Sequence, residues 1–387
     1  MDCHESRLEM EFFMSSFNKN ITIIYGQDIP AMAQNLLTAI NLADTVMHKT
    51  AATGKGKAVR IALKPNLVVA RPASNGATTH PELVGTVVDY LLKNGFTNLA
   101  IVESAWVGDS TSRAYKVCGY EDLSRQYNIP LIDVKKDRTI PYKAGGMTIE
   151  MSQQIMETDF LISFPVLKGH CQTNLTCALK NMKGCISDSS KRQFHSMGLH
   201  RPIALLNQVR SADLVIVDGI CGDLDFEEGG NPVAMNRLIA GQDSVLIDRY
   251  AADLLGFAPE EVAYIGLAEQ FGVGSADLSK AQIIELNENQ FEGMTTSSRK
   301  VEGLARNVVS AEACSACYGS LIHALARLSE KGADIRSLGK LSIGQGFKGK
   351  CQNGIGIGSC TAGFSKSLKG CPPKAIDIMN FLEEQDA

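Results

Sequence analysis

Short apolar runs alternate with a longer amphipathic segment in the first part of the chain. Residues 58–63, 99–102, 160–164 and 214–218 are almost continuously apolar and predict buried strands. Residues 82–94 repeat apolar positions at helical spacing between the first two runs. A strand, a helix and a strand at this spacing predict a parallel sheet with right-handed crossovers. We therefore expect an α/β fold, with a mostly parallel sheet layered with helices.

The chain of 387 residues is longer than one hydrophobic core usually supports. We expect an α/β core over residues 1–295. Residues 296–387 are expected to form a smaller α/β segment that contains the clustered cysteines.

Composition excludes several classes of protein. The first ten residues, MDCHESRLEM, are not followed by the apolar stretch of a secretory leader, and there is no run of about 18 apolar residues. These features predict a cytoplasmic protein without a membrane partner. A net charge of −4 and only 6% aromatic residues also argue against nucleic-acid binding.

Polar side chains follow several of the predicted strands. In parallel sheets, chemistry collects on the loops at the carboxyl ends of the strands. Lysines there bind anionic carboxylates or phosphates, or act as bases when they are desolvated, and histidines act as acid–base groups or metal ligands. For any single residue, a cap or turn role is the alternative. We expect catalytic roles for His170, Lys180, Lys168 and His200, and contacts to a small anionic substrate from Lys64, Asn66, Asn181, Lys183 and Asp218.

Two further segments bear on this site. Residues 180–191 have a solvated basic loop as their alternative interpretation, and we interpret Cys171, Cys177 and Cys185 as small buried hydrophobic residues. The pattern of residues 218–232 predicts an acidic, glycine-rich loop after a strand. They do not match a calcium loop, so we expect them to form salt bridges with the lysines rather than to hold a divalent cation.

The cysteines after residue 310 suggest a metal centre. Cys314 and Cys317 form a Cys-x2-Cys pair at a helix start, where the helix dipole favours thiolates. With Cys360 and Cys371 they provide four ligands for a 4Fe-4S cluster. Cys351 lies in a basic stretch without a paired motif. Zinc and a purely structural cysteine tail are the alternatives.

The runs 64–67, 164–170, 179–184, 218–220 and 243–248 resemble the domain-of-unknown-function 362 family. The resemblance covers roughly residues 20–270. The family takes its name from the lack of an assigned reaction, and it often occurs with iron–sulfur ligands. Residues 370–373, Gly-Cys-Pro-Pro, are similar to the last-ligand motif of iron–sulfur oxidoreductase subunits. Both resemblances imply a cluster here.

A more distant likeness concerns mechanism. The order His170, Lys180 and then His195 or His200 resembles the lactate racemase family, in which a lysine anchors a nickel-pincer nucleotide and histidines shuttle protons. The Gly-Gly-x-Lys context of that family is absent, because Ala178 and Leu179 precede the lysine. We therefore do not expect the nickel-pincer nucleotide.

The leading hypothesis is an anaerobic iron–sulfur oxidoreductase that acts on a small anionic metabolite in a crevice lined by lysine and histidine. A racemase-like or isomerase-like proton-transfer enzyme is the first alternative. The second is an electron-transfer protein that has no substrate of its own. These hypotheses are compatible with a redox partner protein and with a homodimer.

Overall fold

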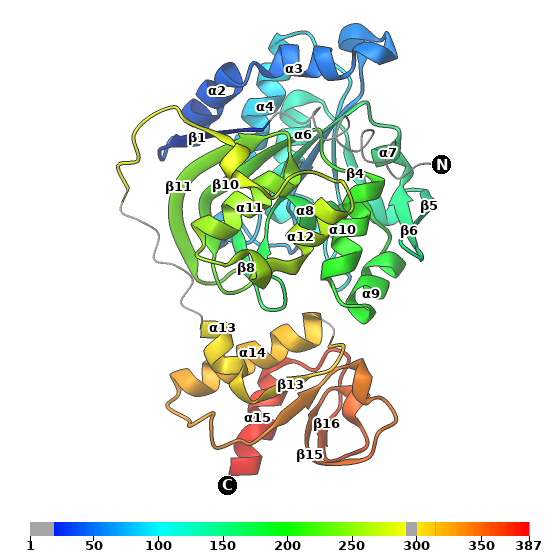
Figure 1. Ribbon diagram of the computed structural model, residues 1–387, viewed down its shortest axis with the longest axis vertical. Coiled ribbons are helices and arrows are strands. Elements are labelled where there is room, and N and C mark those ends of the chain that lie inside the picture. Colours follow the sequence, from blue (N-terminus) through cyan, green and yellow to red (C-terminus); the bar gives the residue numbers. More distant parts are fainter. Residues whose placement is uncertain (1–18, 292–299, 314, 387) are drawn as a thin grey trace. The chain divides into compact units, whose positions relative to one another are not determined.

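The computed structural model describes residues 19–291, 300–313 and 315–386 (Figure 1). Within these residues the chain divides into two compact units. The smaller unit holds residues 170–172, residues 192–199 and the residues described after 296. We call it the C-terminal unit, and the remainder the larger unit.

An eight-stranded sheet forms the centre of the larger unit, in the order β12-β1-β11-β10-β7-β2-β3-β4. The five strands from β10 to β4 pair in parallel, as do β1 and β12, whereas β11 is antiparallel to both of its neighbours. The expected α/β fold with a mostly parallel sheet is confirmed. The strands are β1 (Asn20–Tyr25), β2 (Ile61–Pro65), β3 (Leu99–Glu103), β4 (Leu131–Asp133), β7 (Phe160–Phe164), β10 (Leu214–Asp223), β11 (Pro232–Gly241) and β12 (Gln282–Glu285).

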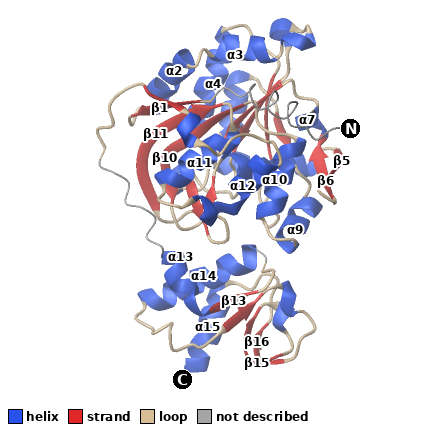
Figure 2. Ribbon diagram, viewed as in Figure 1, coloured by secondary structure: helices blue, strands red, loops and turns tan. Residues whose placement is uncertain are grey.

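Helices cover both faces of this sheet (Figure 2). On one face, Leu63 and Ile162 belong to a core that includes residues of the helices between residues 29 and 127. Because side chains alternate along a strand, the neighbouring Lys64 and Ser163 point to the other face. There they bond to Asn181 of α8. The helices before residue 291 are α2 (Ile29–Ala39), α3 (Leu42–Lys49), α4 (Pro81–Lys93), α5 (Thr111–Val117), α6 (Tyr120–Tyr127), α7 (Gln153–Met156), α8 (Ala178–Asn181), α9 (Asp188–Ser196), α10 (His200–Val209), α11 (Ser244–Leu254) and α12 (Ala263–Gln270). Residues 192–196 of α9 belong to the C-terminal unit.

Two short hairpins complete the larger part of the fold. Strands β5 (Thr139–Ala144) and β6 (Met147–Ser152) pair antiparallel, and β8 (Lys168–His170) pairs with β9 (Asn174–Thr176). The second hairpin follows β7 directly. It therefore begins at the carboxyl end of the parallel sheet.

Two sequence-based boundaries were wrong. The first predicted strand begins at Ile61 rather than at residue 58, because residues 56–58 form a turn of 3-10 helix. The predicted loop after Asp218 is instead strand up to residue 223, which pairs with β11 across a bulge between Gly219 and Cys221. Glycine is required in this extension, since a Cβ atom at Gly222 would lie 2.0 Å from the Leu167 carbonyl oxygen.

The C-terminal unit has its own parallel sheet, in the order β13-β14-β15-β16. Its helices are amphipathic, with Leu321 and Leu325 of α14 and Leu382 of α15 fully buried. The expected α/β character of this segment is confirmed. Its strands are β13 (Val308–Ser310), β14 (Leu341–Ile343), β15 (Gln352–Ile357) and β16 (Phe364–Leu368), and its helices are α13 (Lys300–Leu304), α14 (Ser315–Glu330) and α15 (Ala375–Asp386).

No helix in the described part of the chain combines the length and the apolar character needed to cross a membrane.

Candidate functional site

A buried ion pair joins the ends of β2 and β3. The Lys64 Nζ atom lies 2.8 Å from Glu103 Oε2, and the two side chains are 0% and 3% exposed. Lys64 also donates to Asn181 Oδ1 and to the Pro65 carbonyl, at 3.1 and 3.0 Å. Glu103 accepts the backbone N–H groups of the residues that follow the two strands, Leu67 and Ser104. Both charges are fully hydrogen-bonded, as buried charges must be.

Gly184 lies directly against this pair. A Cβ atom at that position would lie 1.9 Å from Glu103 Oε1 and 2.7 Å from Lys64 Nζ. Only glycine leaves room for the two charges. The run Lys-Asn-Met-Lys-Gly at residues 180–184 therefore requires glycine at its last position.

Lys168 and Lys180 meet at Glu227. Lys168 donates to Asn66 Oδ1 at 3.2 Å, to the Glu227 carbonyl at 2.9 Å and to the Ala77 carbonyl. Lys180 donates to Thr176 Oγ1 at 3.1 Å and forms an ion pair with the Glu227 carboxylate. The predicted salt bridge between the 218–232 segment and the lysines is confirmed.

Two further lysines complete the group. Lys191 donates to Ser104 Oγ, and to the carbonyls of Ser104 and Ala105 at 3.2 and 2.9 Å. It is buried, as is Lys180, so the solvated-loop interpretation of residues 180–191 is wrong for these two residues. Lys183 is half-buried. We call Lys64, Lys168, Lys180, Lys183 and Lys191 the lysine cluster.

Three members of the lysine cluster lose protons near neutral pH. Burial disfavours their charged form and lowers the pKa of Lys168 to about 8, of Lys183 to about 7 and of Lys191 to about 8. The neighbouring Lys180 ammonium adds to the effect on Lys168 and Lys183, whereas Glu227 opposes it. At pH 7 to 8 these amines can both accept and donate a proton.

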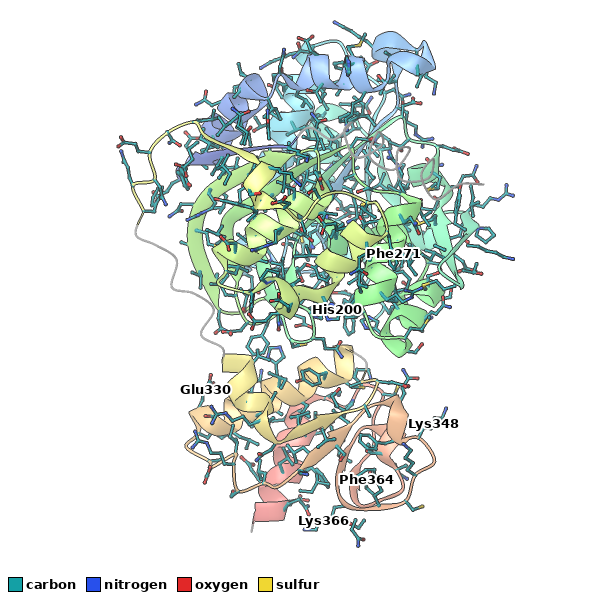
Figure 3. All side chains as sticks on the ribbon, viewed as in Figure 1. His200, Phe271, Glu330, Lys348, Phe364 and Lys366 are labelled. Atoms are coloured by element: carbon teal, nitrogen blue, oxygen red, sulfur yellow. The ribbon has the colours of Figure 1, made fainter. Side chains whose placement is uncertain are left out.

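The predicted histidines have local partners. His170 Nδ1 accepts the Gln172 N–H at 3.1 Å. His200, at the start of α10 (Figure 3), accepts the Tyr264 N–H at 3.2 Å and stacks on the Tyr264 ring. These contacts place His200 at the junction of α10 and α12. The hydrogen bond at its Nδ1 atom is therefore a helix-junction contact, and its catalytic role stays a prediction.

Two titratable residues of this region, His80 and Asp248, were not predicted from the sequence. The Asp218 carboxylate, predicted to bind substrate, accepts from both His80 N and His80 Nδ1, at 2.7 and 2.8 Å. Asp248 of α11 accepts the Ala178 and Leu179 N–H groups at 2.6 and 3.1 Å, which fixes the start of α8. A histidine just before a Pro-initiated helix and an acid inside an apolar helix were the available signals.

Residues 61–253 match the family model described as Domain of unknown function (DUF362). This part of the chain belongs to the DUF362 family. The DUF362 region contains every member of the lysine cluster, together with Glu103, Glu227 and Asp248.

Other similarities are more distant. A thylakoid-associated protein from Synechocystis sp. is 26% identical over 230 residues, which are 55% of this chain and 68% of that protein. The lactate racemase apoprotein of Thermoanaerobacterium thermosaccharolyticum aligns with a TM-score of 0.39 and 12% identity, covering 60% of this chain and 56% of that one. A protein from Thermotoga maritima aligns with a TM-score of 0.33 and 13% identity, over 58% of each chain. The chain thus spans little more than half of each of these two solved proteins.

The C-terminal cysteines lie outside the DUF362 region. Cys360 follows β15 and Cys371 follows β16, so both lie at the carboxyl edge of a parallel sheet. Their loops are joined by the Ser359 N–H, which donates to the Gly370 carbonyl at 2.8 Å. Cys317 is in the first turn of α14, which follows β13, and its predicted partner Cys314 lies outside the described residues.

Cys351 is placed differently. It precedes β15, and a Cβ atom at Gly363, just before β16, would lie 3.3 Å from its sulfur. It therefore belongs to the amino edge of the small sheet. Among the described residues, which exclude Cys314, no three His, Cys, Asp or Glu side chains form a metal-binding group.

Proposed function

We propose that the lysine cluster binds a small organic anion and exchanges protons with it, as a racemase or isomerase does. The observation that supports this is the set of three desolvated lysines with pKa values of about 7 to 8 in one family region. A general base works best when its pKa lies near the operating pH. An anion would also stabilise ammonium groups that burial has destabilised.

The contacts assign different roles to the residues of the lysine cluster. Lys180 donates to Thr176 and Glu227, and since an ammonium has three donors, it can also reach a substrate carboxylate. Lys183, which is half-buried and has the lowest pKa of the cluster, is the proton-exchanging group. The Lys64–Glu103 pair positions Asn181 next to them.

The test follows proton exchange at carbon. The protein is incubated in D2O with small 2-hydroxy and 2-oxo acids, and deuterium at C2 of the hydroxy acids and at C3 of the oxo acids is followed by NMR. We expect incorporation into at least one acid, a loss of about 100-fold in Lys183→Gln, and no change in Lys116→Gln, which alters an exposed lysine of α5. Equal rates in the two variants would remove Lys183 from the reaction.

A second candidate function is the iron–sulfur oxidoreductase. The observation that favours it is the carboxyl-edge position of Cys360 and Cys371, with Cys317 at the helix start that follows β13. Cys314, Cys317, Cys360 and Cys371 would hold the cluster. When bound, such a cluster supplies an electron donor and acceptor.

Its test is metal content after purification without oxygen. We expect about four irons per chain and absorption near 400 nm. Both are expected to be lost in Cys360→Ser and Cys371→Ser and retained in Cys351→Ser, whose thiol lies at the opposite edge. A colourless protein with one zinc would replace the cluster by a tetrahedral thiolate site.

A further inference from the structure

The Glu227 carboxylate covers the Lys180 ammonium. The Lys180 side chain is 1% exposed, whereas the side chain of Glu227, its partner in the ion pair, is 20% exposed. Lys180 also donates to Thr176 Oγ1 at 3.1 Å, and Thr176 is buried. Of these two partners of the ammonium, Glu227 is the one that solvent reaches. An anion from solution therefore approaches Lys180 through the position that this carboxylate holds.

The backbone around Glu227 is held by hydrogen bonds on both sides. The Glu227 carbonyl accepts from Lys168 Nζ at 2.9 Å. The completely buried Asp223, at the end of β10, binds both ends of the loop that follows it. Asp223 Oδ1 accepts the Phe226 N–H and its Oδ2 accepts the Asn231 N–H, both at 2.9 Å. The loop can therefore stay in position while the Glu227 side chain alone rotates and uncovers the ammonium.

Electrostatics favour exchange of carboxylates over addition of a second one. Two carboxylates at one ammonium repel each other, and in a buried site this repulsion is poorly screened. Loss of Glu227 without replacement is also unfavourable, because it leaves the buried Lys180 charge uncompensated. An incoming carboxylate that takes over the ion pair avoids both costs. The Glu227 carboxylate, which is already partly exposed, becomes hydrated when it leaves.

We propose that Glu227 is an internal competitor of the substrate: its carboxylate occupies the anion position on Lys180, and the carboxylate of the substrate displaces it. The inference rests on the proposed function, and it names the group that the site recognises. Because the position already holds a planar carboxylate, the ligand is a small carboxylate anion rather than a phosphate ester. The displaced Glu227 side chain turns toward the solvent, and no covalent bond forms or breaks.

Oxalate is the probe, because it presents carboxylates and carries no hydrogen on carbon, so its binding does not depend on proton exchange. Its affinity for the whole protein is measured by isothermal titration calorimetry at about pH 6, below the pKa of about 7 of Lys183. We expect Glu227→Gln to bind oxalate at least about tenfold more tightly than wild type, because the competing carboxylate is gone. The control Glu157→Gln removes a carboxylate that is paired with Arg60 at 3.4 Å, and it should leave the affinity unchanged.

A second variant, Glu227→Asp, decides the question if Glu227→Gln does not fold. It keeps the negative charge, but its side chain is one CH2 group shorter on a backbone that is held in place, so its ion pair with Lys180 is weaker. We expect oxalate to bind it about threefold more tightly than wild type. Adding Lys180→Gln to either variant should remove the gain, because the ammonium that oxalate binds is then absent.

Equal oxalate affinities for wild type and the Glu227 variants, or no binding to any of them, would overturn the proposal. The result is separate from the deuterium experiment. Deuterium exchange with unchanged oxalate affinity would keep the proton-exchange function and remove the role of Glu227. Tighter oxalate binding in the variants, without deuterium exchange into any acid, would support the carboxylate position on Lys180 and reject the proton-exchange function.

Discussion

At the scale of single residues, the site depends on one missing methyl group. Gly184 leaves the volume into which Lys64 and Glu103 fit, and the two charges then satisfy each other and Asn181. Removing either partner, or pushing the two apart, leaves an uncompensated charge in the interior. The stability of the region and the position of Asn181 are therefore coupled.

Replacing Gly184 by alanine should break this ion pair, because the new Cβ would overlap Glu103 Oε1. We expect the free energy of unfolding in urea to fall by roughly 3 kcal/mol. Gly266→Ala is the matched control: the same methyl group is added in α12, where no atom lies within 4 Å. It should be neutral or stabilising by about 0.5 kcal/mol. Equal effects of the two substitutions would contradict this account.

Some of these residues could be predicted from the sequence and others could not. Lys64 and Lys168 could be found because each lies at or just beyond the end of an apolar strand run. His80 could not, because its partner Asp218 is 138 positions away and nothing local pairs the two. Gly184 could be quoted as part of a motif, but its reason is a contact with Glu103 that only the folded chain shows.

At the scale of elements, α8 is a four-residue helix that places Lys180 and Asn181. A helix this short does not form on its own in water. Its first N–H groups are satisfied by Asp248, which lies on α11. Burial raises the pKa of this carboxyl to about 7, although the two backbone hydrogen bonds act in the opposite direction.

The protonation of Asp248 gives stability a defined pH dependence. The pKa of this carboxyl is ordinarily 3.8 and is about 7 in the folded chain, so the folded state keeps a proton that the unfolded state has released. Its stabilising contribution is complete below pH 4 and is lost as the pH rises through 7. Between pH 5 and pH 7, we expect wild type to lose about 2 kcal/mol relative to Asp248→Asn.

Urea unfolding of both proteins at several pH values measures this difference. Taking the difference cancels the carboxyl groups that the two proteins share. A difference that does not change with pH would mean that Asp248 is ionised throughout, and that the α8 hydrogen bonds keep its charge.

Element boundaries were predictable where both faces of a strand are buried. The run 160–164 coincides with β7, all of whose residues are buried. β10 was predicted too short, because three of its last five residues, Gly219 to Asp223, are glycine or aspartate, a composition typical of a loop. These residues form a strand because β11 pairs with them past the point where the parallel pairing of β10 with β7 ends. That pairing partner is not visible in the local pattern.

At the scale of the whole molecule, the described residues form two units, each with its own sheet and buried helices. Trp106 is the only tryptophan in the chain and lies in the larger unit. Tryptophan fluorescence therefore reports the unfolding of that unit, whereas circular dichroism reports both.

Leu382→Ala removes a fully buried side chain of α15 in the C-terminal unit. We expect it to destabilise that unit by about 3 kcal/mol. The circular dichroism transition should shift, while the fluorescence transition of Trp106 stays in place. Leu205→Ala in α10 of the larger unit should move the fluorescence transition instead. Coincident shifts in both signals would show that the two units unfold as one.

The side-chain hydrogen-bond partners of Lys64 lie far along the chain and are therefore synthesised well after it. Lys64 leaves the ribosome 39 residues ahead of Glu103 and 117 residues ahead of Asn181. At usual translation rates, roughly 6 to 23 seconds pass before its last partner has been made. During that time the ammonium stays hydrated, so β2 cannot settle into its final buried position. The centre of the sheet is therefore completed late, only after Asn181 has emerged.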